Sequence, residues 1–193
     1  MNEKLKQEIA TFTVLVKDQF VYGGKKYALE KKRESTDLLF DDFGANWLYG
    51  TIAKYLFRFH NLQRERDLLK IACYSYILWL KRGFFIDDKR EVPVDTNIKI
   101  KEMFFEEFIN KAKNFIWDNF LYWNNSCYCY GSTKILEEVF SILKSFTNLK
   151  WKDITEESLL KIFSLSFIIW RREFAEKKEH DTDTWLEEKK EVK

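Results

Sequence analysis

The sequence has few of the residues that break regular structure, with one proline and six glycines among 193 residues. Folds built from many short strands need frequent turns, which glycine and proline supply, so this scarcity argues against a β-sandwich or a β-barrel. Aromatic residues, in contrast, make up 18% of the chain and hydrophobic residues 46%. Few turns and many large rings favour long helices that pack through bulky side chains. We therefore predict an all-α single domain spanning residues 1–193.

Histidine and cysteine are also scarce, with two and three copies. Neither His60 nor His180 has a partner at the spacing of zinc ligands, and no serine or cysteine has an evident His–Asp partner set. We therefore assign no zinc site and no catalytic triad. An odd number of cysteines without a C-x-x-C pair is typical of reduced thiols in the cytoplasm. Cys127 and Cys129 form a C-x-C pair that could chelate a soft metal, although two small residues in an aromatic turn is the favoured interpretation.

No run of apolar residues reaches the roughly 20 that a membrane span needs. The best candidate, residues 162–170, contains two serines and ends at Arg171 and Arg172. The first residues lack the apolar segment and the small-residue cleavage site of a signal peptide. We expect a cytoplasmic protein that does not contact membranes.

The spacing of apolar residues predicts the order of the helices. Helices are expected over 3–20, 36–43, 46–60, 64–82, 98–123, 132–147 and 155–178, and a further short helix over 25–34 is an option. Gly23 and Gly24 are expected to end the first helix, and Asp153 with Glu156 to form a capping box before the last one. Residues 84–97 are predicted to be a connection, 124–132 a turn, and 179–193 a charged tail.

Helices 46–60 and 64–82 are separated by so few residues that they must fold back on each other. The second helix has Glu65 and Asp67 in its first turn and Lys81 and Arg82 in its last, which complements the helix dipole at both ends. Gly83 is a natural stop. We predict an antiparallel hairpin subdomain at about 44–83, packed against three longer helices (the C-terminal helices span 98–178).

Positive charge is concentrated on this hairpin. The whole chain carries a net charge of +2, which argues against a protein that coats nucleic acid. Residues 44–90, however, hold nine basic and four acidic residues, a net charge of +5, whereas residues 91–193 are net −3. The near-neutral total therefore conceals a basic hairpin set against an acidic C-terminal half.

The basic residues of the hairpin recur at helical spacing and form a candidate site for an anion. Lysine and arginine donate charge-assisted hydrogen bonds to phosphate, and an aromatic ring beside them can stack on a base. Gly50, which precedes these residues on the first hairpin helix, would let a ligand or a neighbouring backbone approach closely. The alternative is that Arg58 or Arg66 pairs with Glu65 or Asp67 on a solvated face. The candidate ligand-binding residues are Gly50, Lys54, Arg58, Arg66 and Lys70, with Trp47 or Tyr55 near the base.

The residues of the hairpin also resemble a known pattern, G-N-x-x-K-Y-x-x-R followed by D-L-x-K-A-x-x-Y. The matching positions are Gly50, Lys54, Tyr55, Arg58, Asp67, Leu68, Lys70, Ala72 and either Tyr74 or Tyr76, with Thr51 in place of the asparagine. The pattern belongs to a small helical family of unknown function that is common in phages and is sometimes labelled nucleotide-kinase-like. The resemblance implies a helical hairpin and a phage or mobile-element protein.

The hairpin is also distantly similar to the core of MazG-type all-α nucleoside triphosphate pyrophosphohydrolases. Those enzymes bind Mg²⁺ through acidic residues on two helices, where this sequence has lysine and arginine. The nearest acidic substitute is Glu34, Asp37 and Asp41, which share one helical face. We favour the interpretation that these residues only stabilise a helix N-terminus, and Mg²⁺ would be a cofactor only if the protein is an enzyme.

Three functions follow from these observations, and the sequence leaves catalysis open. The first is a cytoplasmic protein that binds a nucleotide or other phosphate-bearing ligand. The second is a non-enzymatic interaction protein, a regulator or inhibitor of a host complex or a homodimer, that uses the basic hairpin or an aromatic turn. The third is a divergent Mg²⁺-dependent pyrophosphohydrolase. Nucleic acid is disfavoured because Tyr55 and Phe59 lie on the apolar face. The aromatic turn comprises Trp117, Tyr122, Trp123, Tyr128 and Tyr130.

Overall fold

A computed structural model describes residues 3–27, 35–84 and 98–175, and every regular element within these ranges is a helix. The all-α prediction is confirmed for this part of the chain. None of these helices combines the length and the apolar character needed to cross a membrane. The elements are α1 (Glu3–Tyr27), α2 (Ser35–Phe43), α3 (Ala45–Leu62), α4 (Glu65–Arg82), α5 (Ile98–Asn148), the 3₁₀ turn η1 (Trp151–Asp153), α6 (Glu156–Trp170) and the π-helical turn η2 (Arg171–Ala175).

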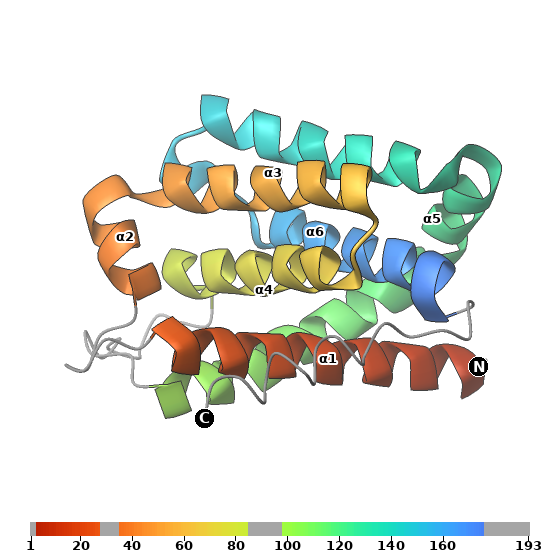
Figure 1. Ribbon diagram of the computed structural model, residues 1–193, viewed down its shortest axis with the longest axis horizontal. Helices are drawn as coiled ribbons and strands as arrows, with labels where there is room; N and C mark the ends of the chain where they lie inside the picture. The colour runs from red at the N-terminus through yellow and green to blue at the C-terminus, as the bar shows by residue number, and fades with distance from the viewer. Residues whose placement is uncertain (1–2, 28–34, 85–97, 176–193) are drawn as a thin grey trace.

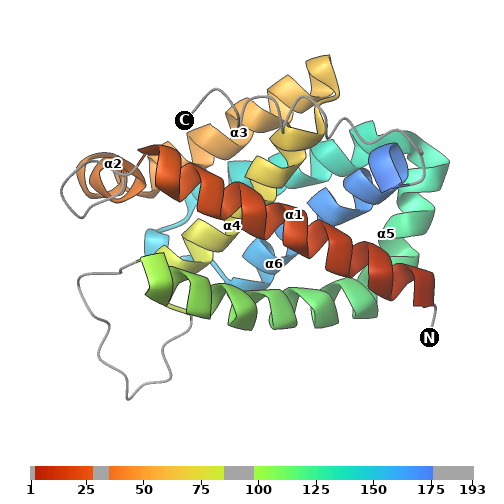
Figure 2. The same cartoon turned by 60° about the horizontal axis from the view of Figure 1, so that its bottom comes forward.

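Helix α6 lies at the centre of the fold, and the other long helices surround it (Figure 1). From Leu159 to Trp170 its residues are buried, apart from Lys161. The helix packs mainly against α4 and α5, and α1 runs across α4 on another side (Figure 2). A helix that is apolar all round is expected in such a central position, because each of its faces needs a partner.

The abundant aromatic residues form the contacts between the helices. Phe12 of α1 is fully buried, and its ring centroid lies 5.4 Å from that of Phe163, 5.6 Å from that of Phe167 and 5.3 Å from that of Trp170. These are edge-to-face or tilted arrangements, which aromatic pairs prefer. Packing between helices thus explains much of the high aromatic content of the chain.

The predicted hairpin is present as α3 and α4, which run antiparallel (Figure 1). Gln63 adopts the left-handed conformation, with φ 50°, and its N–H donates to the carbonyl of Phe59. Gly83 ends α4 with φ 80°, and its N–H donates to the carbonyl of Leu80. Both helices therefore end at a residue in the left-handed conformation.

The expected end of the first helix at Gly23 and Gly24 is wrong, because α1 continues to Tyr27. Glycine in a helix interior costs only about 1 kcal/mol, and packing can outweigh it. In this case α1 packs along α4, and Gly23 lines a cavity between helices α1 to α4. The optional helix over 25–34 falls partly in α1, and residues 28–34 lie outside the described residues.

The expected capping box of Asp153 and Glu156 is also wrong. The N-cap of α6 is Thr155, whose hydroxyl accepts a hydrogen bond from the N–H of Ser158. The carboxylate of Glu156 instead accepts hydrogen bonds of 2.7 Å from the indole N–H of Trp79 and from Lys111. The carboxylate of Glu156 therefore binds two residues that are distant in the sequence and does not form the cap that the local pattern predicts.

The turn expected over 124–132 is much shorter than predicted. Helix α5 continues through residues 124–130 and reverses at Gly131, which has φ 80° and ψ 170°. Its second arm returns beside α3 (Figure 1), where Phe146 packs on Tyr49 with ring centroids 5.4 Å apart. Arg172 of η2 donates to the carbonyl of Cys127, which ties the bend to the end of α6. The expected connection at 84–97 (apart from Phe84) and the charged tail at 179–193 lie outside the described residues.

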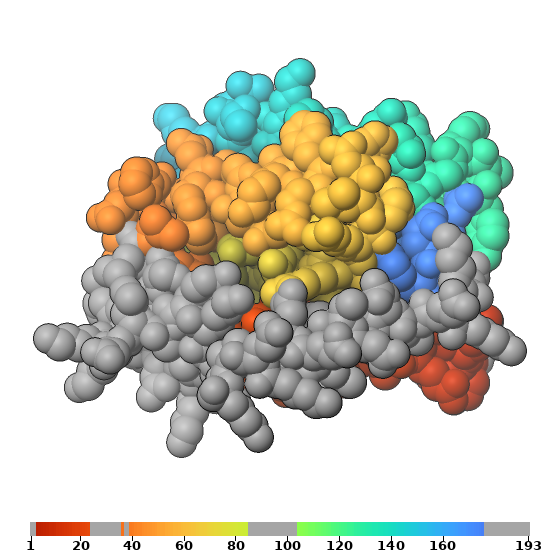
Figure 3. Space-filling view, in the orientation of Figure 1, coloured from red at the N-terminus to blue at the C-terminus, as the bar shows by residue number. Residues whose placement is uncertain are grey.

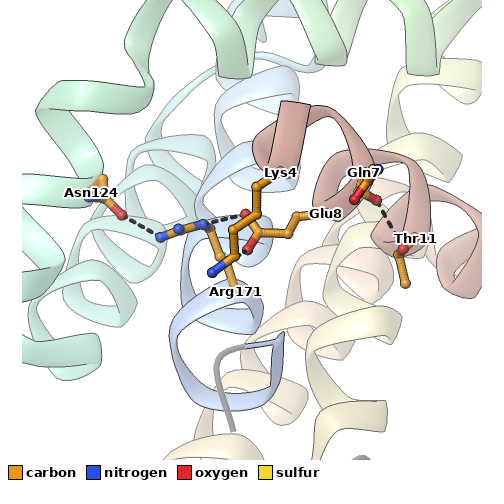
Figure 4. A network of polar contacts seen from close by, with 6 residues as sticks. All are labelled: Lys4, Gln7, Glu8, Thr11, Asn124 and Arg171. Carbon is orange, nitrogen blue, oxygen red and sulfur yellow. Dashed lines mark hydrogen bonds and ion pairs between the residues drawn. The ribbon is translucent and has the colours of Figure 1, made fainter. Parts of the chain in front are cut away.

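A polar cluster anchors the first half of α1 (Figure 4). The guanidinium of Arg171 donates to Glu8 at 2.7 Å and to the side-chain oxygen of Asn124 at 3.0 Å. The side chains of Glu8 and Arg171 are only 9% and 12% exposed, and Lys4 lies 3.7 Å from Glu8. The ion pair joins α1 to η2, and the hydrogen bond to Asn124 adds the α5 bend, so the cluster connects positions that are far apart in the sequence.

Candidate ligand pocket between helices α1 to α4

A cavity of about 420 Å³ lies between helices α1, α2, α3 and α4. Helices α2 and α3 form much of the surface on one side of this region (Figure 3). The cavity wall includes Lys54 and Tyr55 from α3, Lys70 and Tyr74 from α4, and Gln19 from α1. The hairpin thus supplies both cationic and aromatic groups to one space, and α1 supplies a polar amide.

Two lysines from different helices meet at the same ring of this cavity. The ammonium groups of Lys54 and Lys70 each lie 4.8 Å from the ring centroid of Tyr55, and the guanidinium carbon of Arg58 lies 5.6 Å from it. Cations are attracted to the face of an aromatic ring at such distances. The ring therefore holds the positive charges close together although they repel one another.

Tyr55 belongs to an aromatic wall. Its ring stacks on that of Tyr74, with centroids 5.9 Å apart and an interplanar angle of 19°. Trp47 meets Tyr74 edge-on at 6.1 Å. All three residues line the cavity, and Tyr55 is otherwise buried. A flat apolar wall beside two ammonium groups can accept a planar ring that carries an anionic substituent.

The environment of Lys70 disfavours its charge. Burial lowers its pKa from the usual 10.5 to about 8, and the nearby cations Arg66, Arg58 and Lys54 act in the same direction. Asp67 opposes the shift. A bound anion would relieve this repulsion, so the site is electrostatically prepared for negative charge.

Asp67 is the acidic residue at the centre of these cations. Its side chain is only 1% exposed, and one of its oxygens lies 3.5 Å from the Nε atom of Arg58. Within the described part of the chain neither carboxylate oxygen accepts a hydrogen bond. Burial raises the pKa of Asp67, and Arg58 is the first of the cations that lower it. Arg58 therefore pairs with an acid, as in the alternative drawn from the sequence, but with a buried acid.

The structure separates the predicted ligand residues into two groups. Trp47, Lys54, Tyr55 and Lys70 line the cavity, whereas Arg58, Arg66 and Gly50 are not part of its wall. Arg66 lies over the ring of Tyr22 on α1, at 5.7 Å from the centroid. Gly50 is exposed, and a Cβ atom there would meet nothing within 4 Å. Close approach of a neighbouring backbone thus does not explain this glycine.

Gln19 is the wall residue that the sequence argument missed. It is only 5% exposed, and no described residue donates a hydrogen bond to its Oε1 atom. A signal was available, because position 19 follows the buried Val16 at i+3 and so belongs to the apolar stripe of α1. A polar residue in such a stripe is expected to be buried, and a buried polar residue is a candidate for a functional role.

The candidate metal ligands do not form a site in the described part of the chain. Glu34 lies outside the described residues, the side chain of Asp37 is not among them, and Asp41 is exposed. Within residues 3–27, 35–84 and 98–175, no three acidic, histidine or cysteine side chains come close enough to hold a metal ion. Cys127 is buried and Cys129 exposed, since positions two apart lie on different sides of a helix.

The predicted aromatic turn is partly core and partly surface. Trp123 is buried, at 2% exposure, whereas Tyr122 and Tyr130 are 70% and 73% exposed. Tyr128 and Trp117 are exposed to a smaller extent. The bend of α5 therefore presents large side chains to solvent, and this surface stays a candidate for a protein partner.

Comparison with protein families, curated proteins and solved structures gave no match to this chain. The resemblance of the hairpin to a phage-associated family and to MazG-type enzymes therefore stays a prediction from the sequence.

Proposed function

We propose that this protein binds a phosphate-bearing ligand, most simply a nucleotide, in the cavity between helices α1 to α4. The observation that carries the proposal is the position of Lys54 and Lys70, whose ammonium groups both lie 4.8 Å from the ring of Tyr55 on the cavity wall. Paired ammonium groups suit the oxygens of a phosphate. The lowered pKa of Lys70 supports this proposal, because the charged form of a lysine is unfavourable in this site and a bound anion would stabilise it.

The remainder of the cavity suits the organic part of a nucleotide. Its volume of about 420 Å³ falls within the usual range for small-molecule sites, roughly 300–1,000 Å³. Trp47, Tyr55 and Tyr74 provide rings against which a base can stack. Arg58 and Arg66 add positive potential from outside the wall. The hairpin pattern is in line with a phage or mobile-element protein, and catalysis is not part of the proposal.

Replacement of Lys54 by methionine is expected to weaken binding of a nucleoside monophosphate about tenfold to a hundredfold, because a charge-assisted contact to phosphate is lost. The remaining binding should also be less sensitive to salt. Isothermal titration calorimetry at two salt concentrations measures both effects. Lys144→Met is the matched control, since Lys144 is exposed on α5 and does not line the cavity. Equal affinities for Lys54→Met and Lys144→Met would contradict the proposal.

An interaction protein is the second candidate, and the exposed bend of α5 favours it. Leu121, Tyr122 and Tyr130 are 75%, 70% and 73% exposed, and large apolar groups at a surface often mark a protein interface. Size-exclusion chromatography with light scattering and calorimetry on the same sample separate the two functions. An interaction protein is expected to form a complex or a dimer and to ignore nucleotides.

A further inference from the structure

The two lysines of the cavity wall differ in exposure, although the ammonium group of each lies 4.8 Å from the ring centroid of Tyr55. Lys54 is exposed to solvent, whereas Lys70 is partly buried. Arg58 and Arg66 lie nearby but are not part of the wall. Lys70 is therefore a partly covered amine at the wall of a cavity that is large enough for a small ligand.

The described residues of the wall offer Lys70 no acidic partner. Apart from the two lysines they are neutral, and Cys73, Tyr74 and Ile77 continue the wall along α4. Asp67, one turn before Lys70 on the same helix, is not part of this wall, and one of its oxygens lies 3.5 Å from Arg58. The amine thus has cationic and apolar neighbours at the cavity.

Such surroundings favour the neutral form of a lysine, which is its nucleophilic form. Burial is the main cause that lowers the pKa of Lys70 to about 8, and Arg66, Arg58 and Lys54 act in the same direction, against Asp67. At pH 7 about one tenth of this amine is then neutral, compared with roughly one part in three thousand for an unperturbed lysine. Lys70 can therefore act as a nucleophile near neutral pH.

The remainder of the cavity favours a planar and anionic partner for this nucleophile. The rings of Tyr55 and Tyr74 stack with centroids 5.9 Å apart, and Trp47 meets Tyr74 edge-on, so a flat ring can lie against this wall. Lys54 shares the ring of Tyr55 and can bind an anionic group while Lys70 reacts. We propose that the amine of Lys70 forms an imine with a planar aldehyde that carries a phosphate group, an inference that rests on the proposed phosphate site.

The reaction balances without an oxidant or a reductant. The lone pair of the neutral amine attacks the carbonyl carbon, so that a C–N bond forms and the carbonyl oxygen takes up a proton. The oxygen then leaves as water, with both hydrogens supplied in the net reaction by the amine, and a C=N double bond forms. Water can reverse each step, so the aldehyde is bound covalently but reversibly.

Pyridoxal 5′-phosphate, a planar aldehyde with one phosphate group, is the probe that tests this inference. The wild-type protein is mixed with an equimolar amount at pH 7, the imine is reduced with sodium borohydride, and the modified lysines are located by peptide mass spectrometry. Lys70 is expected to be labelled at least about tenfold more than the exposed Lys144. Equal labelling of these two lysines, or a label on Lys54 in place of Lys70, would overturn the inference.

The variant Lys70→Arg separates the amine from its charge. A guanidinium stays protonated and forms no imine, yet it donates to phosphate. Incorporation of the probe into Lys70→Arg is therefore expected to fall at least about tenfold, whereas Lys144→Met should be labelled as the wild type. Undiminished incorporation into Lys70→Arg would overturn the inference.

The part of Lys54 is tested with pyridoxal, which has the same ring and aldehyde but no phosphate. Lys54→Met is expected to slow the labelling of Lys70 by pyridoxal 5′-phosphate about tenfold more than it slows labelling by pyridoxal, because only the first probe loses a contact to its phosphate. Equal slowing with both probes would contradict the placement of the phosphate at Lys54.

This inference and the proposed function fail in different ways. If a nucleoside monophosphate binds and Lys54→Met weakens its binding, but Lys70 is not preferentially labelled, the phosphate site stands and imine formation is wrong. If no nucleotide binds and pyridoxal labels Lys70 as fast as pyridoxal 5′-phosphate does, the proposed phosphate site is wrong, and the inference that rests on it is wrong as well.

Discussion

Replacement of Lys70 by methionine is expected to weaken nucleotide binding about a hundredfold and at the same time to stabilise the free protein. Lys70 lines the cavity and shares the ring of Tyr55 with Lys54, so methionine removes one of two charged contacts to phosphate. In the free protein that charge is unfavourable, because burial and three neighbouring cations lower the pKa of Lys70 to about 8. Removal of the charge should raise the free energy of unfolding by about 1 kcal/mol, after allowance for solvent screening.

Replacement of Lys70 by methionine should also remove part of the pH dependence of stability and of nucleotide binding. In the folded protein the pKa of Lys70 is about 8, below the 10.5 of an unperturbed lysine. The unfolded chain therefore holds more protons between these values, and the stability of the wild type gains a contribution as the pH rises from about 8 to 10.5. Binding changes in the opposite direction, since loss of the proton above pH 8 removes a charge that attracts the phosphate.

Thermal unfolding and calorimetric titration with a nucleoside monophosphate, each at pH 7, 8 and 9, measure these effects. The second ionisation of a monophosphate is nearly complete at pH 7, so the ligand itself changes little over this range. Lys70→Met should lack both pH-dependent contributions. A variant that binds as tightly as the wild type, or that is clearly less stable, would contradict the assigned role of Lys70.

Replacement of Arg171 by methionine is expected to lower the free energy of unfolding by about 3–5 kcal/mol, the usual effect of breaking a buried ion pair. Arg171 lies 2.7 Å from Glu8, and both side chains are nearly buried. Without the guanidinium, Glu8 would keep the contact with Lys4, at 3.7 Å, as its ion pair within the described residues, and Asn124 would lose the donor that Arg171 supplies. Helix α1, which carries Gln19 to the cavity, would lose its main polar anchor (Figure 4). Chemical denaturation measures the change.

Two further variants show whether burial is the cause. The double variant Glu8→Leu with Arg171→Met should recover most of the loss, because no unpaired charge stays buried. Lys134→Met removes an exposed ion pair to Glu137, whose side chains are 61% and 62% exposed at a separation of 3.2 Å. It should cost less than about 1 kcal/mol. If Arg171→Met and Lys134→Met cost the same, the pair with Glu8 does not anchor α1.

The fold could be predicted from the sequence where local chemistry decides it. The acidic start of α4 at Glu65, its basic end at Lys81 and Arg82, and the stop at Gly83 are all found in the structure. Tertiary contacts decided the positions that were wrong. Glu156 is bound by Trp79 and Lys111, which are far away in the sequence, and α1 extends past Gly23 because it packs on α4.

The residues of the candidate site could likewise be predicted from the sequence only in part. Lys54 and Lys70 stand out as basic positions on adjacent helices, and both reach the cavity. Arg66 follows the same periodicity, yet its side chain lies over Tyr22 because α1 packs beside α4. Gln19 could not be assigned to the cavity from the hairpin pattern, since α1 meets the hairpin only in the tertiary fold. Periodicity identifies the face of a helix, but not which neighbour covers it.

Calorimetric titration of the wild-type protein with AMP, ATP and inorganic pyrophosphate, each with and without Mg²⁺, tests the existence of the phosphate site. We expect saturable binding of at least one nucleotide at a single site, with an affinity that falls as salt is added and as the pH rises above 8. Absence of binding for all three compounds, with and without Mg²⁺, would contradict the proposal that Lys54 and Lys70 form a site for phosphate.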